Sequence, residues 1–420
     1  MSQSAQASQS CCDNHAGGLP VEEARARIKA GIQPVTTRER VALRDALNRV
    51  LAEDVHSPVP VPAHDNSAMD GYAVRGQDVA GDGATDLEVV GRTLAGETFD
   101  GELGSGECIR IMTGAPMPAG GDTVIMQEQA DRVGDRIRVH GPHPSGNHVR
   151  RAGEDLAEGE RILAAGQRIG PAELGVMASA GLVEISVFRR LRVAFFSTGD
   201  ELQGVGQPLG PGQIYDSNRY TLFAAMQRLG VEAVDMGVVG DDKESLERAF
   251  REASAFADVL VTSGGVSVGE ADYVKDTLDA LGEVDFWKVA LRPGRPLAYG
   301  RLGRALFFGL PGNPVSVMAT WYQITRPALL HMMGAQPEPD QYFPVRCAEP
   351  LRKRPGRMEF QRGILSWNES GQPEVRTTGA QGSGILSSVS RANCFIVLPY
   401  NAGSVEAGET VMVQPFHGLM

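Results

Sequence analysis

The spacing of hydrophobic positions changes along the chain, and each change marks a different kind of structure. Apolar residues at helical spacing predict two amphipathic helices near the N-terminus, over residues 19–30 and 40–51. Short β-like runs between glycine- and proline-rich turns follow to about residue 144. From residue 191 strands alternate with amphipathic helices, which is typical of βαβ units and a doubly wound parallel sheet. Beyond residue 335 only strands and turns are indicated, which favours a small β-barrel.

These changes predict a multidomain α/β protein, as does a length of 420 residues. A proline-rich run at 57–67 predicts an extended connector, and proline at the start of 171–180 predicts a helix there. The expected parts are a disordered tail (1–18), a discontinuous helical and connector domain (19–60 with 145–190), a small β-rich domain (61–144), an α/β domain (191–335) and a C-terminal β domain (336–420).

Composition narrows the function classes. The formal net charge of -12 argues against a nucleic-acid partner, because a phosphate backbone favours a positive protein surface. Neither a secretory signal nor a membrane-spanning run is recognisable, so a cytoplasmic protein is expected. The five cysteines are scattered and odd in number, unlike a disulfide framework or a zinc site. Cys11, Cys12 and His15 could hold a soft metal, but their Ser/Gln-rich surroundings favour an unstructured tail.

Acidic residues follow the strands of the expected α/β domain. Thr198 leads to Glu201 after one strand, and a second strand runs into Asp241. After a third strand, residues 263–272 contain Gly264, Gly265, Ser267 and Asp272. Because ligands bind at the carboxyl ends of such strands, these carboxylates should share one edge with a cation, and oxygen ligands suit Mg²⁺. Each could instead begin a helix in a capping box, as Thr198/Glu201, Asp241/Glu244 and Ser267/Glu270.

Cationic and small polar residues come next. Prolines surround Lys288, Arg292 and Arg295 at 287–296, where guanidinium groups could bind an oxyanion through two hydrogen bonds. The alternative is a solvated basic turn. At 310–316, Asn313 and Ser316 begin a helix that could also receive an anion. A basic run at 352–357 could steer an anionic substrate, although a solvated loop is the simpler interpretation. No P-loop sequence is present.

Nine ordered motifs resemble the MoeA-type molybdopterin molybdenumtransferases, the family that includes the gephyrin E domain. DNSAMDGYAVR and SGGVSVGEADY are the most diagnostic of them. The resemblance runs from about residue 19 to the C-terminus through residues 65–75, 110–118, 150–155, 196–202, 214–218, 263–273, 286–296, 309–316 and 359–363.

The resemblance implies an elongated four-domain homodimer that inserts molybdate into adenylyl-molybdopterin with Mg²⁺ and releases AMP. It also implies transient contact with a molybdopterin adenylyltransferase, and no membrane partner. The residues that it assigns to catalysis are Asp70, Thr113, Glu201, Asp241, Asp272, Lys288, Arg292, Arg362 and Ser383, with Glu201, Asp241 and Asp272 as metal ligands. The loop and helix-start chemistry described above adds the expected substrate-binding residues Gly264, Gly265, Ser267, Arg295, Asn313 and Ser316.

Arg292 and Arg295 depart from the lysines more often found in this loop of the family, and the hydrogen-bond geometry of the cations changes with them. Two other functions remain open. One is the adenylyltransferase that makes the substrate, whose α/β fold resembles residues 191–335. The other is a scaffold module, since related domains in some eukaryotic proteins organise receptors.

Overall fold

The computed structural model describes residues 18–265, 277–278 and 280–416. The chain folds into two compact units, each described here by itself. Of the described residues, the first unit holds those up to Glu39, residues 48–50 and those from Val187 onward, and the second holds residues 40–47 and 51–186. Among the described residues, no helix has both the length and the apolar character needed to cross a membrane.

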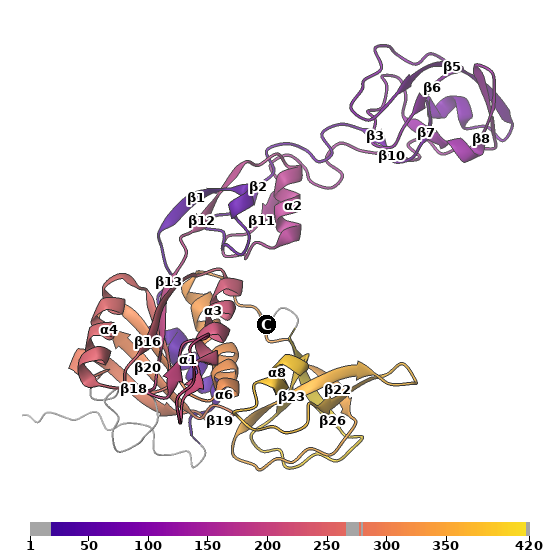
Figure 1. Ribbon diagram of the computed structural model, residues 1–420. Coiled ribbons are helices and arrows are strands. Elements are labelled where there is room, and N and C mark those ends of the chain that lie inside the picture. Colours follow the sequence, from indigo (N-terminus) through magenta and orange to yellow (C-terminus); the bar gives the residue numbers. More distant parts are fainter. Residues whose placement is uncertain (1–17, 266–276, 279, 417–420) are drawn as a thin grey trace, which may run out of the picture. The chain divides into compact units, whose positions relative to one another are not determined.

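A six-stranded sheet forms the centre of the first unit (Figure 1). In spatial order its strands are β16 (Glu232–Val239), β13 (Arg192–Thr198), β17 (Val259–Ser263), β21 (Ala305–Leu310), β20 (Pro296–Leu302) and β18 (Gly282–Lys288). The first four are parallel, which confirms the doubly wound α/β fold. Strand β20 pairs antiparallel with β21, and β18 pairs antiparallel with β20. The strand–helix rhythm did not predict this antiparallel edge, because prolines and arginines interrupt the connection between its two strands.

Alternate side chains of the central strands face opposite sides of the sheet. Phe195 and Phe308 pack on one side with helices α1 (Val21–Gly31), α3 (Ser217–Leu229), α6 (Pro314–Thr320) and α7 (Arg326–Met332). Phe196 and Phe307 pack on the other side with α4 (Lys243–Phe256). A π-helical turn at Trp321–Thr325 joins α6 to α7. The two faces give the sheet a double apolar core, as continuous hydrophobic strands require.

The C-terminal region is a closed barrel, as expected. Its five strands follow the ring β23 (Met358–Trp367), β24 (Pro373–Thr377), β22 (Phe343–Cys347), β26 (Thr410–Pro415) and β25 (Cys394–Leu398), which pairs again with β23. Strand β19 (Leu291–Arg292) adds to β23 from the α/β region. The expectation of strands and turns alone was wrong at α8 (Ser387–Arg391). This helix of five residues is too short to show an apolar period in the sequence.

The second unit contains a β-rich body and smaller pieces. Its six-stranded sheet has the order β7 (Thr123–Met126), β4 (Gly71–Val74), β6 (Glu107–Ile111), β5 (Ala84–Thr93), β9 (Arg136–His140) and β8 (Ala130–Val133). The predicted helix at 171–180 is present as α2 (Pro171–Ser179). The remaining strands pair in twos, as β1 (Arg38–Ala42) with β12 (Glu184–Phe188), β2 (Val55–His56) with β11 (Arg161–Leu163), and β3 (Asn66–Ser67) with β10 (Val149–Arg150).

The predicted helix over 40–51 is wrong, whereas that over 19–30 is confirmed as α1. Strand β1 and a short 3₁₀ turn at Leu43–Asp45 occupy this stretch instead. Asn48 has a φ of 64°, a left-handed conformation that no continuous α-helix accommodates. The apolar spacing reflects burial of single residues beside strand β12 and in the adjoining turns, so tertiary contacts override the helical period.

Asp258, at the start of β17, is held by a two-pronged ion pair with Arg189 at 2.6 and 2.7 Å. Burial alone would raise the pKa of Asp258, but hydrogen bonds from Arg189 and the Arg192 N–H hold the pKa below its usual value. A depressed folded pKa stabilises the protein above the unfolded carboxyl pKa, and this stabilisation is lost as the pH falls through the folded value. We expect Asp258→Asn to lower the free energy of unfolding by about 2 kcal/mol at pH 7, measured by urea titration.

The difference between wild type and Asp258→Asn should shrink as the pH falls below the unfolded carboxyl pKa of about 3.9. It should be lost as the pH passes the lower folded pKa, where the folded wild-type carboxyl also takes up a proton. Asp86→Asn is the matched control, because Asp86 forms the same two-pronged pair with Arg138 on the exposed surface. Exposed pairs contribute little to stability. An equal and pH-independent loss in both variants would contradict the assignment.

Candidate functional site

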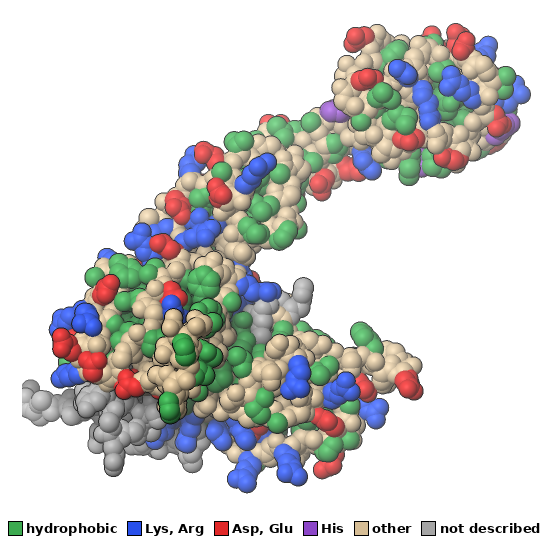
Figure 2. All heavy atoms as spheres, in the orientation of Figure 1, with side chains coloured by type: hydrophobic (Ala, Val, Ile, Leu, Met, Phe, Trp, Pro, Cys, Tyr) green, Lys and Arg blue, Asp and Glu red, His purple; other side chains and the backbone are tan. Residues whose placement is uncertain are grey.

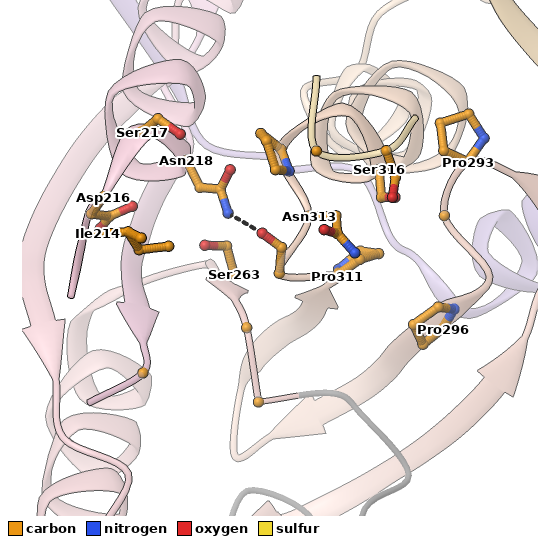
Figure 3. Close-up of a pocket in the computed structure, with 18 of the residues that line it drawn as sticks. Ile214, Asp216, Ser217, Asn218, Ser263, Pro293, Pro296, Pro311, Asn313 and Ser316 are labelled. Carbon is orange, nitrogen blue, oxygen red and sulfur yellow. Dashed lines mark hydrogen bonds between the residues drawn. The ribbon is translucent and has the colours of Figure 1, made fainter. Parts of the chain in front are cut away.

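A cavity of about 950 Å³ lies at the carboxyl ends of β13, β17 and β21. Its remaining walls come from the start of α3, the 292–296 connection, the start of α6 and the barrel segment 381–384. Figure 3 shows Asp216, Ser217 and Asn218 on one side, with Pro293, Pro296 and Ser316 on the other. The topology therefore gathers the predicted loops at the edge where ligands of α/β sheets bind.

Glu201 and Asp241 both line the acidic side of this cavity. The capping interpretation is wrong for both. Helix α4 is capped by Asp242, whose carboxylate accepts the Ser245 N–H at 2.9 Å, and β14 (Leu202–Gln203) rather than a helix follows Glu201. The predicted residues Ser267 and Asp272 lie outside the described residues. No cluster of three His, Cys, Asp or Glu suited to a metal occurs within the described part of the chain.

Gly264 and Gly265 follow β17 and also line the cavity. Both have positive φ, of 90° and 66°. A Cβ on Gly264 would lie 2.5 Å from the carbonyl oxygen of Thr198, so the backbone of this loop packs directly against the end of β13. Only glycine permits this close approach, which keeps the middle of the cavity open.

Arg292 and Arg295 supply the cationic side. Arg292 lies on β19, opposite Glu359 of β23, and its guanidinium donates to the Glu359 carboxylate at 2.9 Å. Glu359 is only 3% exposed, and its second oxygen accepts from Gln361. The barrel, through Glu359, thus holds one side of the Arg292 guanidinium group. Lys288 is an exposed residue at the end of β18 and is not among the residues that line the cavity.

Asn313, Ser316 and Ser383 meet at the start of α6. All three line the cavity, and the Val315 N–H donates to the Ser383 carbonyl at 3.0 Å. This bond attaches the barrel segment to the helix, so small polar groups from distant parts of the sequence lie beside the two arginines. The structure therefore brings together most of the described residues that the resemblance assigned to the α/β domain.

Arg362 lies just behind this wall and is 1% exposed. Its guanidinium donates to the Ser388 hydroxyl at 2.9 Å and to the Gly382 carbonyl at 3.0 Å. Burial lowers the pKa of Arg362 to about 10, so it remains charged at neutral pH. It lines a neighbouring cavity of about 270 Å³ together with Arg292 and Gln381. Its visible contacts therefore hold the segment that carries Ser383.

Asp70 and Thr113 lie together in the second unit. One carboxylate oxygen of Asp70 accepts from the N–H of Thr113 at 2.8 Å and from its hydroxyl at 2.7 Å. These hydrogen bonds hold the pKa of Asp70 below its usual value. The two residues form a polar pair that keeps a carboxylate ionised at the surface of this unit.

Several lining residues received no role in the sequence analysis. Asp216, Asn218 and Gln381 line the main cavity, and Glu359 binds Arg292. The motif at 214–218 was the available signal for the first two. The solvated-loop interpretation of 352–357 is wrong at Lys353, a buried ammonium group that donates to the carbonyls of Arg354, Tyr400 and Ala402.

Three family models match the chain in the same order as its structural parts. They are the MoeA N-terminal region (domain I and II) over residues 19–181, the probable molybdopterin binding domain over 194–331, and the MoeA C-terminal region (domain IV) over 344–416. This chain belongs to the MoeA family.

Individual MoeA relatives extend over nearly the full length of the chain. A molybdopterin molybdenumtransferase of Haemophilus influenzae is 44% identical and covers 96% of this chain and 100% of its own. A Nostoc protein of the same name is 37% identical, covering 89% and 88%. Among solved structures, a molybdopterin biosynthesis MoeA protein of Pyrococcus horikoshii has a TM-score of 0.79 at 28% identity, covering 94% of this chain and 99% of its own.

Proposed function

We propose that this chain is a molybdopterin molybdenumtransferase, which inserts molybdate into adenylyl-molybdopterin and releases AMP and the molybdenum-loaded pterin. One observation carries the proposal. A single cavity has carboxylates on one side, from Glu201 and Asp241, and cations on the other, from Arg292 and Arg295. A phosphate-bearing substrate that must also receive an oxyanion needs both kinds of group in one place.

The carboxylates fit a Mg²⁺ ion, because two of them line the same wall and Mg²⁺ commonly combines one or two carboxylates with substrate phosphates. We assign Glu201 and Asp241 to this ion, with Asp272 as a further ligand. When bound, the ion would supply neutralisation of charge at the phosphate oxygens. The two carboxylates thereby orient the adenylate end of the substrate.

On the cationic side, Arg292 and Arg295 bind the molybdate oxygens, with Ser316 and Ser383 as hydroxyl donors. Lys288 does not line the cavity and adds positive charge from the end of β18. Arg362 holds the Ser383 segment from behind. A water oxygen adds at the phosphorus on the pterin side, the phosphoanhydride P–O bond breaks, and AMP leaves with the bridging oxygen and its electron pair. The pterin keeps a phosphate that contains the water oxygen, and the proton that is set free passes to solvent. Fixed guanidinium groups stabilise the charge that develops on the oxygens, because they are oriented before the reaction begins.

We further propose a homodimer, in which Asp70 and Thr113 of a second copy complete the site. In its support, apolar side chains gather over the region of α3 (Figure 2), where Tyr220 is 53% exposed and Phe223 42% exposed. Large exposed apolar side chains grouped together are typical of an association surface. The protein would act in the cytoplasm and receive adenylyl-molybdopterin from an adenylyltransferase in transient contact, with neither nucleic acid nor membrane as a partner.

The decisive experiment incubates the purified chain with adenylyl-molybdopterin and Mg²⁺, with and without molybdate, and measures AMP by chromatography. We expect AMP release that requires molybdate and stops when EDTA removes the divalent cation. A parallel incubation with molybdopterin and ATP tests the alternative enzyme. Formation of adenylylated pterin there would favour an adenylyltransferase, and AMP release in neither incubation would favour a scaffold.

A further inference from the structure

Three oxygen atoms in the cavity wall have no hydrogen-bond partner among the described residues. They are Oδ2 of Asp216, Oδ1 of Asn218 and Oγ1 of Thr198. All three residues line the main cavity, and Asp216 and Thr198 are only 3% and 4% exposed. A buried oxygen without a donor is costly, and for a carboxylate the cost is greatest. Such a set is retained where a ligand supplies the missing donors.

Hydrogen bonds to neighbouring backbone groups determine which side-chain atoms of Asp216 and Asn218 remain without a partner. Asp216 caps α3, and its Oδ1 accepts the Arg219 N–H at 3.1 Å, which leaves Oδ2. The amide of Asn218 donates through Nδ2 to the Gly312 carbonyl at 2.7 Å, which leaves Oδ1 (Figure 3). Both side chains are therefore held in one orientation, and each leaves an oxygen acceptor without a partner among the described residues.

The carboxylate of Asp216 and the amide oxygen of Asn218, which lacks a partner among the described residues, favour a ligand that carries hydrogen-bond donors. Molybdate and phosphate oxygens would be repelled by Asp216, and they have cations on the opposite side of the cavity. The amine of adenine adjoins ring nitrogens that are themselves acceptors. An aminopyrimidinone ring instead presents a ring N–H directly beside an exocyclic amine, which gives two adjacent donors. The pterin half of the proposed substrate contains this ring.

We propose that Asp216 and Asn218 bind the aminopyrimidinone edge of the pterin, with Asp216 Oδ2 and Asn218 Oδ1 accepting from its ring N–H and amine. This inference rests on the proposed function and adds the direction in which the substrate lies. The pterin points toward the start of α3, and its anionic portion points toward Arg292 and Arg295. Asp216 then determines specificity for the pterin ring rather than taking part in phosphorus chemistry.

The test uses two fluorescent probes, pterin and lumazine. Lumazine has a carbonyl oxygen in place of the exocyclic amine of pterin. We expect the wild-type protein to bind pterin at least tenfold more tightly than lumazine in fluorescence titrations. Asp216→Asn retains the helix cap and the size of the side chain, but it replaces the acceptor Oδ2 with an NH₂ group. This variant should lose the preference for pterin, because the NH₂ group of asparagine would then face the ring N–H and amine of the pterin. It should bind AMP as the wild type does.

Asp242→Asn is the matched control. Asp242 caps α4 through the same kind of bond, at 2.9 Å to the Ser245 N–H, but it is exposed and does not line the cavity. The preference for pterin should be unchanged in this variant. If Asp216→Asn weakens AMP binding as well, Asn218→Ala decides the question, since it leaves the cap intact. We then expect reduced pterin binding with normal AMP binding.

Two results would overturn the inference: no preference for pterin in the wild type, or an undiminished preference in Asp216→Asn and, where that variant binds AMP poorly, in Asn218→Ala. Neither result bears on molybdate-dependent AMP release, which tests the proposed function separately. Conversely, a protein that prefers pterin as described but releases no AMP would retain the pterin site and lose the proposed reaction.

Discussion

Replacing Asp241 by asparagine is expected to lower the rate of molybdate-dependent AMP release by about 100-fold or more. Asp241 follows β16 and is half-buried on the acidic wall of the cavity. An amide oxygen keeps the shape of the side chain but removes the charge that would attract a divalent cation. Loss of one electrostatic partner at a reacting phosphate commonly costs this much in rate. The measurement is AMP release at increasing Mg²⁺, where the variant should need a higher concentration.

The neighbouring residue provides the control for this change. Asp242→Asn removes an equal charge one position away, yet Asp242 caps α4 and does not line the cavity. Its rate should stay within about threefold of wild type, since exposed charges contribute little. Equal losses in the two variants would indicate a general effect of charge on the loop and would refute the specific role of Asp241.

Replacing Arg362 by methionine is the second change with a large expected effect, of about 100-fold in kcat/KM for molybdate. Methionine fills a comparable apolar volume, but it removes the donors to Ser388 and to the Gly382 carbonyl. The segment that carries Ser383 then loses its two guanidinium hydrogen bonds to β23 and keeps those between the backbone of residue 362 and the Gln381 side chain. The buried positive charge behind the cavity also disappears. We expect the free energy of unfolding to change much less, because replacing a buried charge with an apolar group also removes its desolvation cost.

Arg362→Lys separates charge from geometry. Lysine keeps the positive charge but not the planar fork that reaches two acceptors, so an intermediate loss is expected. Arg391→Met on α8 is the control, because Arg391 is exposed and its guanidinium donates only to the nearby Ser387 carbonyl among the contacts of the described residues. A normal kcat/KM in Arg362→Met would show that the Ser383 segment needs no support from this residue.

The sequence predicted the architecture well where a period or a strand end carried the signal. The apolar runs of β13, β16 and β17 placed Glu201, Asp241 and Gly264 at one edge, and the structure has all three in one cavity. Helix boundaries near prolines and glycines could also be predicted from the sequence. The helix predicted over 40–51 was wrong because the apolar residues of this stretch are buried by strand pairing and not along one helical face.

The details of the cavity were less accessible because they depend on contacts between distant residues. Glu359 and Arg292 are 67 positions apart, and only the pairing of β19 with β23 brings their side chains together. Burial is equally hard to predict, since the run at 352–357 has the composition of a solvated loop, whereas Lys353 is buried and donates to the carbonyls of Tyr400 and Ala402. Asp216 and Asn218 showed acidic and amide character in the sequence, but not which of their atoms remain without a partner.

Strand β19 has a consequence for the modular character of the MoeA fold. Its two residues belong to the connection between β18 and β20, yet their strand partner is β23 of the barrel. Phe360 and Phe395 of the barrel also share a hydrophobic cluster with the sheet. The α/β region and the barrel are therefore not interchangeable cassettes. A recombination event that joined this sheet to a foreign C-terminal domain would have to rebuild a backbone pairing before Arg292 could be oriented again, so the two parts are expected to be inherited together.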